Sequence, residues 1–212
     1  LRIKNKNISS FVDKPEFSIA VLVSDNFEKY DSMVDENNKI KKIKKQIDIL
    51  SIGSAKIKSS HLDNLENVND NKVKSIKDEI EKRDEIQKQI DGYIAELTKL
   101  HQLRDSIIEK LEYFSDNTDC PLCGFDYKER KLLEEALSLK TKKIEKFIEK
   151  NDNALNLSFK SIKDKIDVVA NDLSNIHSEK INSFNSGLFE YLSVNINKRE
   201  TVEKIANKIK EL

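Results

Sequence analysis

Apolar residues recur at alternating steps of three and four over two long stretches of this chain. In the first stretch eight of twelve seam positions are apolar, and the four polar positions fall in two pairs. Side chains at this spacing form one stripe along a helix, which is the pattern of a coiled coil with weakened layers. The seam positions are Val73, Ile76, Ile80, Arg83, Gln87, Ile90, Ile94, Leu97, His101, Arg104, Ile108 and Leu111.

The second stripe has a similar length and begins near Glu129. Two consecutive steps of four around Ile148 interrupt the heptad at the Asn151–Asn153 cluster, so we expect the supercoil to unwind locally there and the arm to bend. A short, turn-rich connection joins the stripes and favours antiparallel neighbours. Because each stripe needs a partner, the sequence predicts an all-α fold, a long antiparallel coiled-coil hairpin. The second seam is Leu133, Leu137, Lys140, Ile144, Ile148, Asp152, Leu155, Phe159, Ile162, Ile166, Val169, Leu173 and Ile176.

Composition agrees with long helices. Charged residues make up 36% of the 212 residues, against a typical value of about 25%, and there are only 4 Gly, 2 Pro and no Trp. So few turn formers fit long helices with narrow apolar stripes better than a compact fold of many elements. Lys plus Arg equals Asp plus Glu, at 38 each, so net charge gives no preference for nucleic acid.

Signals for membranes or secretion are not recognisable in the sequence. No apolar run approaches the ~20 residues needed to span a bilayer, and no signal peptide opens the chain. The only two cysteines form a single CxxC motif, which is typical of a reducing compartment. We therefore expect a cytoplasmic protein without a membrane partner.

Changes in pattern divide the chain into five parts. The base of the arm, residues 1–30, contains the apolar, β-prone run Phe17–Val23, which predicts a small β element near the N-terminus. We expect the first coiled-coil arm over residues 31–114, the tip over 115–128, the second arm over 129–183 and a helical base over 184–212.

Three segments interrupt or end these parts. Ser51–Ser54 stops a helical stripe that runs through Ile40 to Leu50, and the Asn/Asp-rich stretch from Asp63 to Asn71 predicts either a loop or a weak point in the arm. In the base, Phe184–Leu192 is rich in aromatic residues, and Thr201 is placed to cap a final helix.

The tip holds the motif Cys120-Pro121-Leu122-Cys123-Gly124. Two residues between the cysteines let both sulfurs turn toward one zinc ion at about 2.3 Å. Pro121 stiffens the turn, and Gly124 can take the left-handed conformation that lets following N–H groups face the sulfurs. Nearby basic residues would offset the thiolate charge: Lys128, Arg130 and Lys131.

One CxxC motif supplies two of the four ligands that a structural zinc site requires. His101 lies 19 residues before Cys120, which is about 28 Å along a helix. His61 and His177 are farther away in the sequence. The simplest completion is a second copy of the chain, so the motif predicts one zinc ion shared by a homodimer through Cys120 and Cys123.

Two alternatives use other chemistry. Cys120 and Cys123 would form a thiol redox couple or inert free thiols if no metal binds, although a redox CxxC usually opens a helix beside a βαβ pattern, which is not seen before Cys120. A coiled-coil DNA-binding scaffold without zinc would use the basic run Lys39, Lys41, Lys42, Lys44 and Lys45. A solvated helix face accounts for the same run in a lysine-rich chain.

The Cys120-Pro121-Leu122-Cys123-Gly124 motif, at the turn between two coiled-coil arms, resembles the zinc hook of the Rad50 and SbcC family of SMC-like ATPases. The match is close at the tip and rests on pattern alone in the arms. The resemblance implies that Cys120 and Cys123 bind zinc together with the same pair of a second hook. Short-armed SMC-like proteins of bacterial anti-phage systems such as Lamassu are similar.

The same resemblance implies a larger protein. The chain has no G-x-x-x-x-G-K-[ST] phosphate loop, so we expect no enzymatic activity from it alone. ATP would bind only in head domains that flank this region in the full-length protein, which would be the ATPase. DNA would be bound through that full-length protein, in DNA repair or antiviral defence, together with a nuclease or effector subunit.

Overall fold

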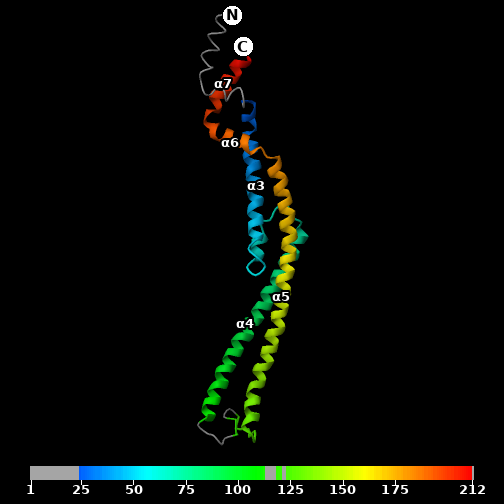
Figure 1. The fold of residues 1–212 in the computed structure, drawn as a ribbon, viewed down its shortest axis with the longest axis vertical. Helices are drawn as coiled ribbons and strands as arrows, with labels where there is room; N and C mark the ends of the chain where they lie inside the picture. Colours follow the sequence, from blue (N-terminus) through cyan, green and yellow to red (C-terminus); the bar gives the residue numbers. More distant parts are fainter. Residues whose placement is uncertain (1–23, 113–117, 121–122, 212) are drawn as a thin grey trace. The chain divides into compact units, whose positions relative to one another are not determined.

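The computed structural model describes residues 24–112, 118–120 and 123–211 (Figure 1). Helices dominate the described residues, which confirms the all-α class, and the predicted β element at Phe17–Val23 lies outside them. The elements in chain order are η1 (Ser24–Lys29), α3 (Tyr30–Leu50), η2 (Ser59–Leu62), α4 (Asp70–Glu112), α5 (Arg130–Ser183), α6 (Ser186–Asn195), η3 (Ile196–Lys198) and α7 (Arg199–Lys210).

The chain divides into two compact units. Among the described residues, one unit comprises residues 24–48 and 171–211, and the other comprises residues 49–112, 118–120 and 123–170. The boundaries fall inside α3 and α5, so each of these helices contributes to both units.

In the unit of residues 49–170, α4 and α5 run antiparallel, as the two stripes predict (Figure 1). The half of the pair remote from the tip is closely packed. Ser158 Oγ donates to the Glu79 carbonyl oxygen at 3.4 Å and to its carboxylate at 3.2 Å. Lys165 Nζ donates to the Ser75 carbonyl oxygen at 3.3 Å and lies 3.5 Å from Glu79 Oε2. The buried apolar side chains here are Ile76, Ile80, Leu155, Ile162, Ile166 and Val169.

Toward the tip the same two helices are less closely packed, and in Figure 1 they diverge. Every α4 side chain from Asp91 to Ser106 is at least partly exposed, and Ile94, a predicted seam residue, is 47% exposed. The contacts that bridge this part involve large side chains: Tyr93 stacks on Phe147 with centroids 5.8 Å apart, and Lys140 Nζ lies 3.8 Å from Glu96 Oε1.

The part of the seam near the tip also differs in detail from the prediction. Ile107 is buried, whereas its neighbour Ile108 is half-buried, and on α5 Thr141 is buried where Lys140 was expected. The helix α5 is continuous through Asn151–Asn153, so the local break in the heptad does not end the helix.

The described part of the predicted first arm, residues 31–112, contains the two helices α3 and α4 with a folded connection between them. Both predicted interruptions are present: α3 ends at Leu50, and residues 63–69 form no helix. Gly53 takes a φ of +96°, a conformation that favours glycine, and its carbonyl accepts from the N–H of Ile57 at 3.0 Å. Ile57 and Leu62 are fully buried.

Arg83 of α4 holds this connection in place. Its side chain is 7% exposed and donates from Nη1 to the Ser54 carbonyl oxygen at 2.6 Å. Its Nη2 also donates to Asp84 Oδ1 at 2.6 Å. The guanidinium, expected as a weak seam layer, therefore ties two segments that are 29 residues apart.

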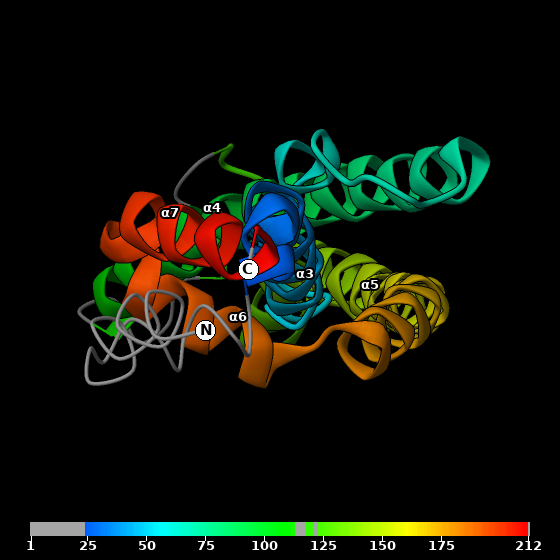
Figure 2. The ribbon, with the colours of Figure 1, turned by 90° about the horizontal axis from the view of Figure 1, so that it is seen from above.

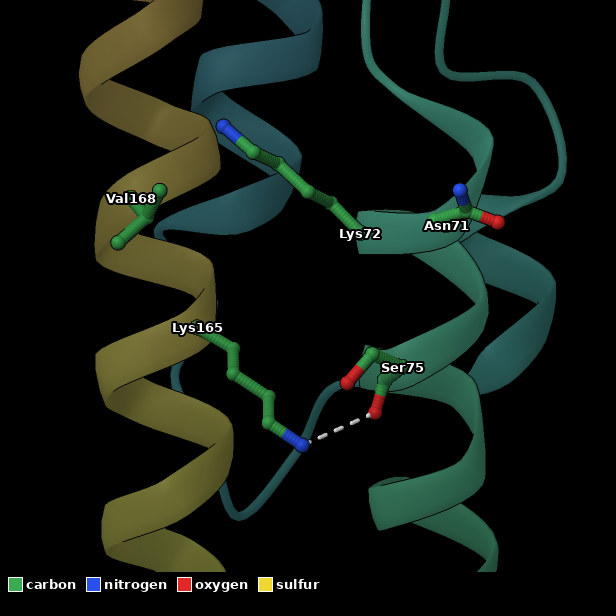
Figure 3. A pocket seen from close by; sticks show the side chains of 5 residues that line it. All are labelled: Asn71, Lys72, Ser75, Lys165 and Val168. Carbon is green, nitrogen blue, oxygen red and sulfur yellow. Dashed lines mark hydrogen bonds between the residues drawn. The ribbon is translucent and has the colours of Figure 1, made fainter.

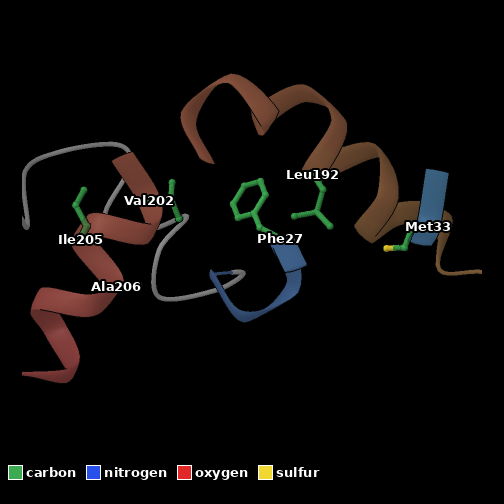
Figure 4. Close-up of a cluster of buried hydrophobic side chains, with 6 residues drawn as sticks. All are labelled: Phe27, Met33, Leu192, Val202, Ile205 and Ala206. Carbon is green, nitrogen blue, oxygen red and sulfur yellow. The ribbon is translucent and has the colours of Figure 1, made fainter. Parts of the chain in front are cut away.

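The other unit has its own core, formed by η1, the start of α3, α6 and α7 (Figure 4). In Figures 1 and 2, η1 and α7 lie side by side. Asn185 caps α6 by accepting from Leu188 N at 2.9 Å, and Phe189 stacks on Tyr30 with centroids 6.0 Å apart. Residues 186–210 are helical, and α7 begins at Arg199, so Thr201 lies inside this helix and not at the cap position predicted for it. The buried members are Phe27, Met33, Leu192, Val202, Ile205 and Ala206.

The described helices include none that combines the length and the apolar character needed to cross a membrane.

Candidate metal centre

The described part of the tip is a short hairpin that carries both cysteines. Asp119 and Asp126 form an antiparallel bridge, flanked by hydrogen bonds from Cys120 N to Phe125 O at 2.9 Å and from Tyr127 N to Thr118 O at 3.2 Å. Gly124 N donates to Cys120 O at 2.7 Å, so the chain turns back and brings Cys123 near Cys120.

Gly124 takes the left-handed conformation that the sequence predicted, with a φ of +69°. A side chain at this position would be strained although the space around the Cα is open. The glycine is therefore required by backbone conformation, and it sets the turn that follows Cys123.

Asp126 closes the hairpin. Its Oδ1 accepts from Thr118 Oγ1 at 2.7 Å and from Lys128 N at 2.7 Å. The hydrogen bond from Thr118 and then that from Lys128 lower the pKa of the Asp126 carboxyl, because both favour its charged form. The sequence prediction missed this residue, although an Asp accepting from the N–H two residues later is a recognisable turn signal.

The two cysteines have different environments. Cys120 is 7% exposed and packs with Ile107 of α4, Leu133 of α5 and the half-buried Tyr127. Cys123 is exposed. The helices therefore hold one thiol in place, and the hairpin presents the other at the surface.

The histidines have other environments. His61 Nδ1 accepts from Lys58 N at 3.2 Å, and His101 Nε2 lies 3.9 Å from Glu145 Oε1. His177 is half-buried on α5. Within residues 24–112, 118–120 and 123–211, no group of three or more His, Cys, Asp or Glu side chains could hold a metal ion.

Thiolates are ligands that Zn²⁺ prefers, and a tetrahedral site needs four of them or an equivalent set. Cys120 and Cys123 fit half of such a site. The exposure of Cys123 leaves the open side of the pair accessible to ligands from outside the chain.

Two of the basic residues near the tip, Arg130 and Lys128, make polar contacts with acidic side chains. Arg130 Nε lies 3.0 Å from Glu134 Oε1, and Lys128 gives its N–H to Asp126. On α3, all five residues of the basic run are exposed, and Lys44 Nζ lies 3.2 Å from Asp48 Oδ1.

A hollow of about 290 Å³ lies between the start of α4 and α5 (Figure 3). It is lined by Asn71, Lys72, Ser75, Lys165 and Val168. The Lys165 ammonium in this hollow is already engaged by Ser75 and Glu79.

Comparison with models of protein families, with curated proteins and with solved structures finds no match to this chain.

Proposed function

We propose that this chain is a zinc-dependent dimerisation and tethering module. Cys120 and Cys123 of two copies would together bind one zinc ion, which would join two helical hairpins at their tips. The observation that supports this proposal best is the CxxC hairpin between antiparallel α4 and α5, with a buried first cysteine and an exposed second one. Two thiolates on a prepared turn make half of a tetrahedral site.

The arms would then act by geometry. The 43 residues of α4 span about 65 Å at 1.5 Å per residue. A shared zinc ion would link what lies at the far ends of two such arms. By the resemblance stated above, these are the ATP-binding heads of an SMC-like ATPase acting on DNA with a nuclease or effector subunit, in repair or antiviral defence.

The hairpin context is less suited to a thiol redox couple. Redox CxxC motifs usually lie where a helix begins, whereas α5 begins at Arg130, seven positions after Cys123. The exposed lysines of α3 support DNA binding as an additional function. The affinity for DNA would then fall steeply as the salt concentration rises.

Zinc content and mass in solution test the proposal. We expect one zinc ion per two chains and a dimer by light scattering. Cys120→Ser and Cys123→Ser should lose both the metal and the dimer while keeping the helical circular dichroism signal. His101→Ala is the control that should keep both.

One zinc ion per monomer without dimerisation would refute the shared site. Absence of zinc together with a reversible Cys120–Cys123 disulfide would favour the redox couple.

A further inference from the structure

An exposed aromatic ring lies beside the candidate metal ligands. Phe125 follows Gly124 in the tip hairpin and is 61% exposed. Water contact with so large an apolar side chain is unfavourable, so burial of this ring in a contact would be favourable.

The structure holds this ring in a defined position. The Phe125 carbonyl accepts from Cys120 N at 2.9 Å, which fixes its backbone within the hairpin. Its ring meets Tyr127 edge to face, with centroids 4.9 Å apart and planes at 75°. Tyr127 in turn packs on the buried cluster of Ile107, Cys120 and Leu133. Phe125 is therefore presented to solvent by a supported hairpin, as preorganised interface residues are.

Resting on the shared zinc site proposed above, we propose that Phe125 is the apolar contact through which the tip binds a second copy of the same tip. The argument comes from the ligand count. Cys120 and Cys123 need two further ligands, and these must approach the exposed Cys123, two residues from Phe125. A two-fold dimer uses the same patch on both copies, so each interface would bury two Phe125 rings.

The contact has two expected effects. Burial of both rings adds hydrophobic free energy to the dimer beyond the metal bonds. The rings also exclude water and competing chelators from the thiolates, since the hydrophobic surroundings of a metal site control solvent access.

The test compares Phe125→Ala with Leu157→Ala in the whole chain saturated with zinc. Leu157 is 69% exposed on α5, so its truncation controls for the loss of an exposed apolar side chain away from the tip. The dimer dissociation constant is measured by sedimentation, and the rate of zinc loss is measured with a chromophoric chelator.

We expect Phe125→Ala to keep one zinc ion per two chains at high protein concentration, to weaken the dimer roughly 10- to 100-fold, and to release zinc faster. Leu157→Ala should change neither quantity. If the wild type forms the zinc dimer but Phe125→Ala has the same dimer dissociation constant and the same rate of zinc loss, the Phe125 contact is refuted and the shared zinc site is not. A wild type without a zinc-dependent dimer would overturn the shared site as well.

Discussion

Leu133 connects the tip that carries both cysteines to the helices, so its truncation to alanine tests how the thiols are positioned. The side chain is fully buried in the first turn of α5 and packs with Ile107 and Cys120. This cluster is small, and Tyr127 at its edge is only half-buried. Loss of Leu133 should therefore loosen the tip hairpin more than the arms.

The free-energy cost of Leu133→Ala follows from the burial of the Leu133 side chain. Leu→Ala substitutions at fully buried sites cost about 2–5 kcal/mol, and the cost is lowest where neighbours can close the cavity. The open edge at Tyr127 favours the lower range, about 2–3 kcal/mol. If zinc binding requires the packed hairpin, zinc affinity should fall by up to roughly 30- to 150-fold, the full factor applying when the hairpin is only marginally stable without metal.

Zinc affinity is measured by competition with a chelator, and arm stability by thermal unfolding at 222 nm. The matched control is Ile162→Ala, because Ile162 is equally buried but lies in the part of α5 remote from the tip. This control should lower the unfolding temperature and leave zinc affinity unchanged. If both variants changed zinc affinity equally, or if Leu133→Ala left it unchanged, the cluster would not be what positions Cys120.

Two predictions concern the packing of α4. Burial raises the pKa of Glu79, but the hydrogen bond from Ser158 and the charges of Lys82 and Lys165 outweigh it, so the pKa is lowered overall. The ionised Glu79 carboxylate therefore stabilises the folded state at pH values above its unfolded-state pKa of about 4.3. This stabilisation is lost as the pH falls through the lowered folded-state pKa. Glu79→Gln should cost about 1–3 kcal/mol at neutral pH and progressively less as pH falls through the lowered folded pKa, as measured by urea unfolding. Arg83→Ala should expose residues 51–58 to limited proteolysis and cost about 1–3 kcal/mol, because the Ser54 carbonyl loses its donor.

The sequence predicts which face of each helix is apolar better than how closely the faces meet. Ile76, Ile80 and Ile90 are buried as the period requires, whereas Ile94 has the same spacing and is 47% exposed. Periodicity reports the face of a helix, but burial depends on the distance to the neighbouring helix, which local spacing does not encode.

At the tip the motif predicted the left-handed conformation of Gly124 and the proximity of the two cysteines. It did not predict that Leu133 and Ile107 bury Cys120, or that Asp126 closes the hairpin. These contacts join residues across the turn, and they depend on where α4 ends and α5 begins. For the same reason the role of Arg83 could not be read from its seam position, because its partner lies 29 residues away.

The partly exposed stretch of α4 from Asp91 to Ser106 has a mechanical consequence for a tether. Few buried apolar contacts mean a low free energy of local opening. A load applied at the tip would separate α4 from α5 over this stretch first, while the packed contacts of Ser158 and Lys165 with Glu79 remained closed. In the proposed zinc dimer, the helix pair would be compliant near the tip and stiff beyond it. Thermal forces on the two joined tips would therefore separate the helices before they strained the zinc–sulfur bonds.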